Sequence, residues 1–243
     1  STQPRRLRSD SGSQLNLMGT SPRRQELPDI PPLIHQALLN PLLPEEELFT
    51  LCDAARQLGF GAVCVSLNQL EAVRRRLGGQ GSVKLIATVA FPFGALPAEL
   101  KQAQAEWAAA HGADALDVTP NWAALVNGHA NSFAEELAAI AALDLPMTVV
   151  LDINQLNEAQ LALAAEAAID AGAASLQAGN GFGAAVSADQ IRQLRQLSRG
   201  RCAIKAAGGI REPEQALDLV EAGATALGTG HGPALIKALR QQR

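Results

Sequence analysis

The 243-residue sequence contains no tyrosine, and aromatic residues make up only 3% of it. A hydrophobic core must therefore be built from Ala, Leu, Val and Ile. Three cysteines (Cys52, Cys64 and Cys202) are too few and too scattered for a disulfide framework. We expect reduced thiols and a cytoplasmic protein. The four histidines and the carboxylates have no metal-ligand spacing, so no metal site is expected.

Long apolar runs are also absent, so we expect no membrane span and no signal peptide. The net charge of −4 gives no general reason to expect nucleic-acid binding. Lysine is scarce as well, and the four lysines are Lys84, Lys101, Lys205 and Lys237. Only Lys205 is predicted to lie inside the fold, because Lys84 begins a strand and the other two belong to outer helices.

Residues 1–28 differ in composition from the rest of the chain. Ser, Gln, Arg, Pro and Gly dominate this segment, which carries a net charge of +3 and leaves −7 for the remainder. Such a composition predicts disorder in isolation. The element TQPRR at 2–6 recurs as TSPRR at 20–24, so Arg5, Arg6, Arg23 and Arg24 are candidate contacts to an acidic partner protein. A solvated leader without a partner is the alternative.

From residue 33 onward, short apolar runs alternate with longer stretches of helical period. Eight strands are predicted at 33–39, 61–66, 84–90, 115–119, 148–152, 174–178, 203–206 and 225–228. Eight helices are predicted at 44–58, 68–77, 97–111, 132–143, 156–171, 187–198, 212–222 and 233–240. Gly59, Gly112, Gly172 and Gly223 follow four of these helices as expected for C-terminal glycine caps. Evenly spaced units favour a (β/α)₈ TIM barrel spanning 29–243 over a doubly wound sheet.

The active site of such a barrel lies at the carboxyl ends of its strands. The polar or bulky residues predicted at these ends are His35 or Gln36, Ser66, Phe91, Asp117, Asp152, Gln177, Lys205 and Thr229. Polar groups within apolar strands are costly unless they are paired, so several of them should meet at one mouth.

Four segments match one family in order along 33–240. The segment IATVAFPFGA at 86–95 resembles the strand-three signature of deoxyribose-phosphate aldolase, and GADALDV at 112–118 resembles its strand four. The segments AVCV at 62–65 and KAAGGIR at 205–211 resemble its strands two and seven. The resemblance implies a class I aldolase without a cofactor, in which a strand-six lysine forms a Schiff base. It implies supporting roles for Lys205 and Asp117, which we expect to form an ion pair, and it implies self-association.

The resemblance also implies a phosphate site on the backbone of Gly208, Gly209, Gly228, Thr229 and Gly230, where glycine turns present free N–H donors. At the Schiff-base position, however, the sequence ASLQAGNG at 174–181 has Gln177. An amide nitrogen cannot form an imine.

Three interpretations remain open. One is a barrel without lyase activity that binds, regulates or assembles, with a phosphosugar or another small anion as its ligand. Another is an active aldolase that cleaves 2-deoxyribose 5-phosphate to glyceraldehyde 3-phosphate and acetaldehyde through Lys205. The third is a different phosphate-binding barrel enzyme.

Overall fold

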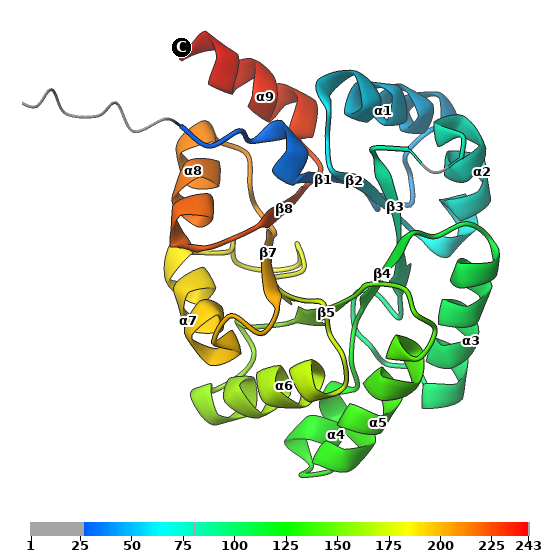
Figure 1. Cartoon of the computed structure of the whole chain (residues 1–243), viewed down its shortest axis with the longest axis vertical. Coiled ribbons are helices and arrows are strands. Elements are labelled where there is room, and N and C mark those ends of the chain that lie inside the picture. The colour runs from blue at the N-terminus through cyan, green and yellow to red at the C-terminus, as the bar shows by residue number, and fades with distance from the viewer. Residues whose placement is uncertain (1–26, 80, 243) are drawn as a thin grey trace, which may run out of the picture.

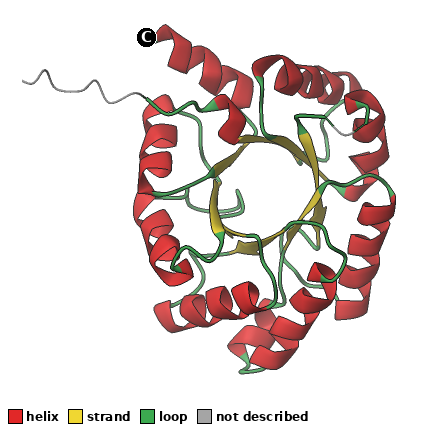
Figure 2. Cartoon of the chain, in the orientation of Figure 1, coloured by secondary structure: helices red, strands yellow, loops and turns green. Residues whose placement is uncertain are grey.

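The chain closes into an eight-stranded parallel barrel surrounded by helices (Figures 1 and 2). The structure, a computed structural model, describes residues 27–79 and 81–242. Arg5, Arg6, Arg23 and Arg24 lie outside the described residues. The strands are β1 Ile34–Leu38, β2 Ala62–Val65, β3 Lys84–Val89, β4 Ala115–Val118, β5 Met147–Leu151, β6 Ser175–Ala178, β7 Ala203–Ala207 and β8 Ala226–Thr229. Each pairs with the next, and β1 pairs with β8 to close the barrel. The TIM-barrel prediction is confirmed.

The helices cover the outside of the barrel (Figure 1). They are α1 Glu45–Leu58, α2 Leu67–Leu77, α3 Ala98–Ala110, α4 Trp122–Val126, α5 Ala130–Ala141, α6 Glu158–Asp170, α7 Ala188–Ser198, α8 Pro213–Ala222 and α9 Gly232–Gln241, and a 3₁₀ turn at Pro31–Leu33 precedes β1. The short helix α4 was not predicted, and α5 begins two residues before the predicted helix. None of the described helices has the length and apolar character needed to cross a bilayer.

Glycine ends the helices where the sequence predicts. Gly59, Gly112, Gly172 and Gly223 all have positive φ, from 73° to 121°, which a residue with a Cβ rarely adopts. Each glycine reverses the chain from an outer helix into the next strand. The repeated cap therefore aligns the strands and brings their carboxyl ends to one face.

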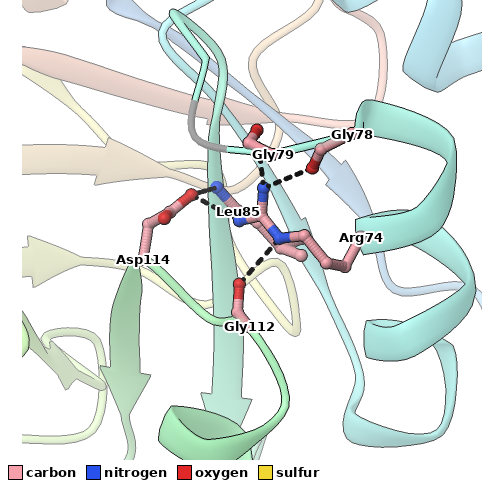
Figure 3. A network of polar contacts seen from close by, with 6 residues as sticks. All are labelled: Arg74, Gly78, Gly79, Leu85, Gly112 and Asp114. Atoms are coloured by element: carbon pink, nitrogen blue, oxygen red, sulfur yellow. Dashed lines mark hydrogen bonds and ion pairs between the residues drawn. The ribbon is translucent and has the colours of Figure 1, made fainter.

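The opposite face, where the strands begin, is held by a polar network around Arg74 of α2 (Figure 3). Its guanidinium donates to the Asp114 carboxylate at 2.6 Å and to the Gly112 carbonyl at 2.9 Å. It also donates to the carbonyl oxygens of Gly78 and Gly79. Asp114 in turn accepts from the backbone N–H of Leu85 at 2.8 Å. Arg74 thereby joins the end of α2 to the starts of β3 and β4.

A second ionic contact lies behind β4. Lys101 of α3 has no exposed surface, and its ammonium donates to Glu136 of α5 at 3.0 Å and to the Thr119 carbonyl at 3.1 Å. The same Glu136 oxygen accepts from the backbone N–H of Asn121. Lys101 does lie on an outer helix, as predicted, but its side chain points inward. The pair fixes the turn that follows β4.

Candidate functional site

The carboxyl ends of the strands surround a cavity of about 220 Å³. His35, Phe91, Asp117, Gln177, Lys205 and Thr229 all line it, so six of the predicted strand-end residues meet as expected. Ser66 lies at the start of α2 and lines a neighbouring hollow, and Asp152, one residue past β5, is not among the lining residues. Burial raises the pKa of the Asp152 carboxyl. The cavity is therefore lined by fewer of these strand-end residues than the sequence pattern predicts.

Lys205 and Asp117 form an ion pair at the centre of the cavity wall. Lys205 Nζ donates to Asp117 Oδ2 at 2.7 Å, and the residues are 3% and 4% exposed. Burial by itself lowers the pKa of the Lys205 ammonium. The nearby Asp117 charge, the Cys64 sulfur and the hydrogen bond to Asp117 outweigh that effect and hold this pKa above its ordinary value. Lys205 is therefore a charged donor at neutral pH.

Two small neighbours shape this pair. Cys64 Sγ donates to Asp117 Oδ2 at 3.5 Å, and burial, together with the Asp117 charge, raises the pKa of its thiol far above the ordinary value. Gly228 of β8 leaves room for the lysine stem, because a Cβ there would lie 3.3 Å from Lys205 Cε and 2.9 Å from Ala207 Cβ. The Cys64 contact has no sequence signal beyond a cysteine within an apolar strand.

Gln177 lies directly beside Lys205 in the β6–β7 register. Its Nε2 donates to the Gly179 carbonyl at 2.9 Å, and the residue is only 4% exposed. Gly179 has a φ of 78°, and a Cβ there would lie 2.2 Å from the Ala207 carbonyl oxygen. The turn after β6 is therefore packed tightly against β7, and it holds the Gln177 amide in one orientation.

Strand β1 presents His35 to the cavity and turns Gln36 away from it. Gln36 is fully buried, donates to the Gly230 carbonyl and accepts from the Gly232 N–H. Desolvation, and then the Lys205 charge, lower the pKa of His35 to about 3, although Asp117 opposes this shift. His35 is thus neutral at physiological pH. Of the two candidates at this strand end, only His35 faces the site.

The glycine turns predicted to bind phosphate also border the cavity. Gly208, Gly209, Gly228, Thr229 and Gly230 line it. The Thr229 hydroxyl donates to the Ile210 carbonyl at 2.6 Å and accepts from the His231 N–H, so it is already engaged. Arg211 also lines the cavity. It was not predicted as a site residue, although it is the last residue of the KAAGGIR motif.

Aromatic rings cluster beside the cavity, which Phe91 lines. The rings of Phe91 and Phe93, which follow β3, lie 6.0 Å from that of Phe182, which follows β6. Phe91 lies in the loop two residues past the end of the strand, because β3 ends at Val89 and Ala90 takes a positive φ of 54°. Phe93 and Phe182 are exposed.

Within residues 27–79 and 81–242, no group of three or more His, Cys, Asp or Glu side chains is arranged to hold a metal ion. The groups that line the cavity include an ammonium–carboxylate pair, a carboxamide, a neutral imidazole, the Arg211 guanidinium and turns rich in glycine. Such a set can bind and orient a small polar anion.

Comparison with known proteins identifies the class of this barrel. A solved structure described as "QR15, an Aldolase" superposes with a TM-score of 0.83 at 28% identity, covering 88% of this chain and 97% of that one. The tetrameric deoxyribose phosphate aldolase of Aeropyrum pernix has the same fold, with a TM-score of 0.77 at 24% identity and coverage of 87% and 91%. The closed barrel with its buried lysine–aspartate pair is therefore an aldolase-type barrel.

Sequence relatives then name the family. Deoxyribose-phosphate aldolase of Crocosphaera subtropica is 35% identical over 210 residues, which cover 86% of this chain and 95% of the relative. That of Thermococcus gammatolerans is 34% identical, with coverage of 87% and 97%. No family model matches the chain. The chain belongs to the deoxyribose-phosphate aldolase family.

Proposed function

We propose that this member of the family no longer forms a Schiff base and uses its cavity to bind a small phosphorylated ligand. The observation that carries the proposal is the state of Gln177, where the family resemblance implies the reacting lysine. Its amide nitrogen has no nucleophilic lone pair and is already bonded to Gly179. Among the described residues that line the cavity, Lys205 is the only lysine, and its pairing with Asp117 keeps it protonated.

The cavity is suited to an anion at one end. The turn at Gly208 and Gly209 supplies backbone N–H groups without side chains, and Arg211 adds a permanent positive charge. A phosphate at this end would leave the rest of the ligand facing Lys205, Asp117 and Gln177. The protein would then act by binding, as a regulatory or assembly component.

An active aldolase that uses Lys205 is the second candidate. Its support is that Lys205 borders the cavity and has Asp117 at 2.7 Å as a proton partner. Against it, an ammonium must lose its proton before it attacks a carbonyl, and the raised pKa of Lys205 opposes that loss.

Reductive trapping distinguishes the two. The full chain is incubated with 2-deoxyribose 5-phosphate and sodium borohydride, and its intact mass is measured. We expect no adduct on the natural chain, whereas Gln177→Lys should give one if the rest of the site is still arranged for imine formation. A covalent adduct on the natural chain that disappears in Lys205→Ala would overturn the proposal.

The segment 1–28 belongs to the proposal as a partner contact. Its net charge of +3 and its paired arginines support binding to an acidic protein surface. Replacing Arg5, Arg6, Arg23 and Arg24 by Ala should abolish retention on immobilised poly-glutamate at 0.15 M salt, and unchanged retention would contradict this role. The three cysteines are free thiols, which supports a cytoplasmic location.

A further inference from the structure

Three side chains that line the cavity carry buried polar atoms with no hydrogen-bond partner among the described residues. These atoms are His35 Nδ1, Asp117 Oδ1 and Gln177 Oε1. Buried polar atoms in folded proteins nearly always have a partner. Three such atoms on strands β1, β4 and β6 around one cavity therefore indicate groups kept for a ligand.

The chemistry of two of these atoms is fixed by the bonds that their side chains already make. Gln177 Nε2 donates to a backbone carbonyl, which can only accept, so the atom without a partner must be the amide oxygen. Asp117 uses Oδ2 for both Lys205 and Cys64, and a carboxylate oxygen only accepts. The ligand therefore meets two hydrogen-bond acceptors.

His35 adds a group that can accept or donate according to its tautomer. The desolvated ring is neutral at pH 7, and a neutral imidazole has one N–H and one bare nitrogen. Lys205, which has two further N–H groups, supplies donors beside Asp117. An alcohol oxygen accepts from Lys205 while its hydrogen bonds to an acceptor. An aldehyde oxygen can do only the first.

We propose that the cavity selects small phosphorylated polyols over the corresponding sugar phosphates, because a polyol offers one hydroxyl more than either the open or the ring form of the sugar. The proposal rests on the proposed function, because it assumes that the phosphate lies near Gly208 and Gly209. Asp117 and Gln177 would read the hydroxyl donors, and Gln177 would be the specificity-determining residue. The role differs from that of a reacting amine, since no bond forms or breaks.

Isothermal titration of the full chain with two matched ligands tests the proposal. One is 2-deoxyribose 5-phosphate, and the other is the alditol obtained from it by prior borohydride reduction and purification. The open and ring forms of the sugar each offer two hydroxyls, whereas the alditol offers three. We expect the alditol to bind about tenfold more tightly, which corresponds to about 1.4 kcal/mol.

The variant Gln177→Met removes the amide oxygen and keeps the side-chain length, so the preference should fall below about threefold. Gln36→Met is the matched control, because Gln36 is a buried glutamine whose two polar atoms are both bonded within the protein. It is expected to lower stability and to leave the ratio of the two affinities unchanged.

Equal or tighter binding of the sugar phosphate to the natural chain would overturn the proposal, and so would a preference that survives in Gln177→Met. Titration with inorganic phosphate separates this failure from that of the proposed function. If phosphate binds but the preference is absent, only the polyol selection is wrong. If neither the two ligands nor phosphate binds, both proposals fail.

Discussion

Replacing Lys205 by Met tests how much the charged pair at the cavity contributes to the fold. The variant keeps the length of the side chain but leaves Asp117 as a buried carboxylate without its cation. Removing one partner of a buried pair destabilises a protein by about 3–5 kcal/mol. Because this pair borders a cavity, we expect the lower end, about 3 kcal/mol.

A double-mutant cycle isolates the coupling between the two side chains. Asp117→Asn still accepts hydrogen bonds from Lys205 and Cys64, so it should cost less than Lys205→Met. The double variant should be less destabilised than the sum of the two singles, by about 2 kcal/mol. Urea unfolding at pH 7, followed by circular dichroism and tryptophan fluorescence, provides the free energies.

The pH dependence of Lys205→Met supplies an independent check. The raised pKa of Lys205 keeps the contribution of the natural pair intact up to the ordinary pKa of lysine, and that contribution is lost at higher pH. The difference in stability between the natural chain and the variant should therefore be the same at pH 6 and pH 8 and should shrink above about pH 10.5. A loss below about 1 kcal/mol without coupling would refute the reasoning and indicate a solvated pair.

Two further predictions concern His35 and Arg74. Since the folded-state pKa of His35 is about 3 against 6.5 when unfolded, the unfolded chain takes up the proton first. The stability of the natural chain should therefore fall as pH drops from about 6.5 towards 3, and His35→Gln should reduce that slope in urea unfolding at pH 7 and pH 5; equal slopes would contradict it. Arg74→Lys keeps the charge but loses the planar fork that reaches Asp114 and Gly112, so thermal and urea unfolding should show a loss of about 2 kcal/mol. Arg192→Lys, in an exposed pair with Asp189, is the control and should change stability by less than about 0.5 kcal/mol; equal effects of the two would disprove the role of the network.

The barrel itself could be predicted because its signals are local. Each unit has an apolar strand, an amphipathic helix and, in four of them, a glycine that only a positive φ explains. The sequence does not show which of the adjacent polar residues His35 and Gln36 in β1 faces the cavity. Side chains alternate along a strand, so only one of the two can point inward. The structure resolves this through Gln36, whose amide is used by the backbone at Gly230 and Gly232.

Other features depend on contacts between distant segments. Strand β3 ends one residue before the predicted strand, because Ala90 takes a positive φ. That conformation has no sequence signal in a residue with a Cβ. The Lys101–Glu136 pair could have been suspected, since both charges occupy positions that helical period assigns to buried faces, beside Ala105 in α3 and Phe133 in α5. Their meeting required knowing that α3 and α5 are neighbours. The free acceptor atoms of the cavity likewise appear only once the bonds of each side chain are known.

The Lys101–Glu136 pair also affects how firmly the cavity is held in place before a ligand binds. Strand β4 is held from the barrel interior by Lys205 on Asp117 and from the helical layer by Lys101 on Thr119, two residues further on. A strand end fixed on both sides has little freedom left to lose when a ligand arrives, so less binding energy is consumed in ordering it. The same rigidity makes the barrel a promising frame for engineering, because a new group introduced at residue 177 would share the cavity with a carboxylate whose position is already set.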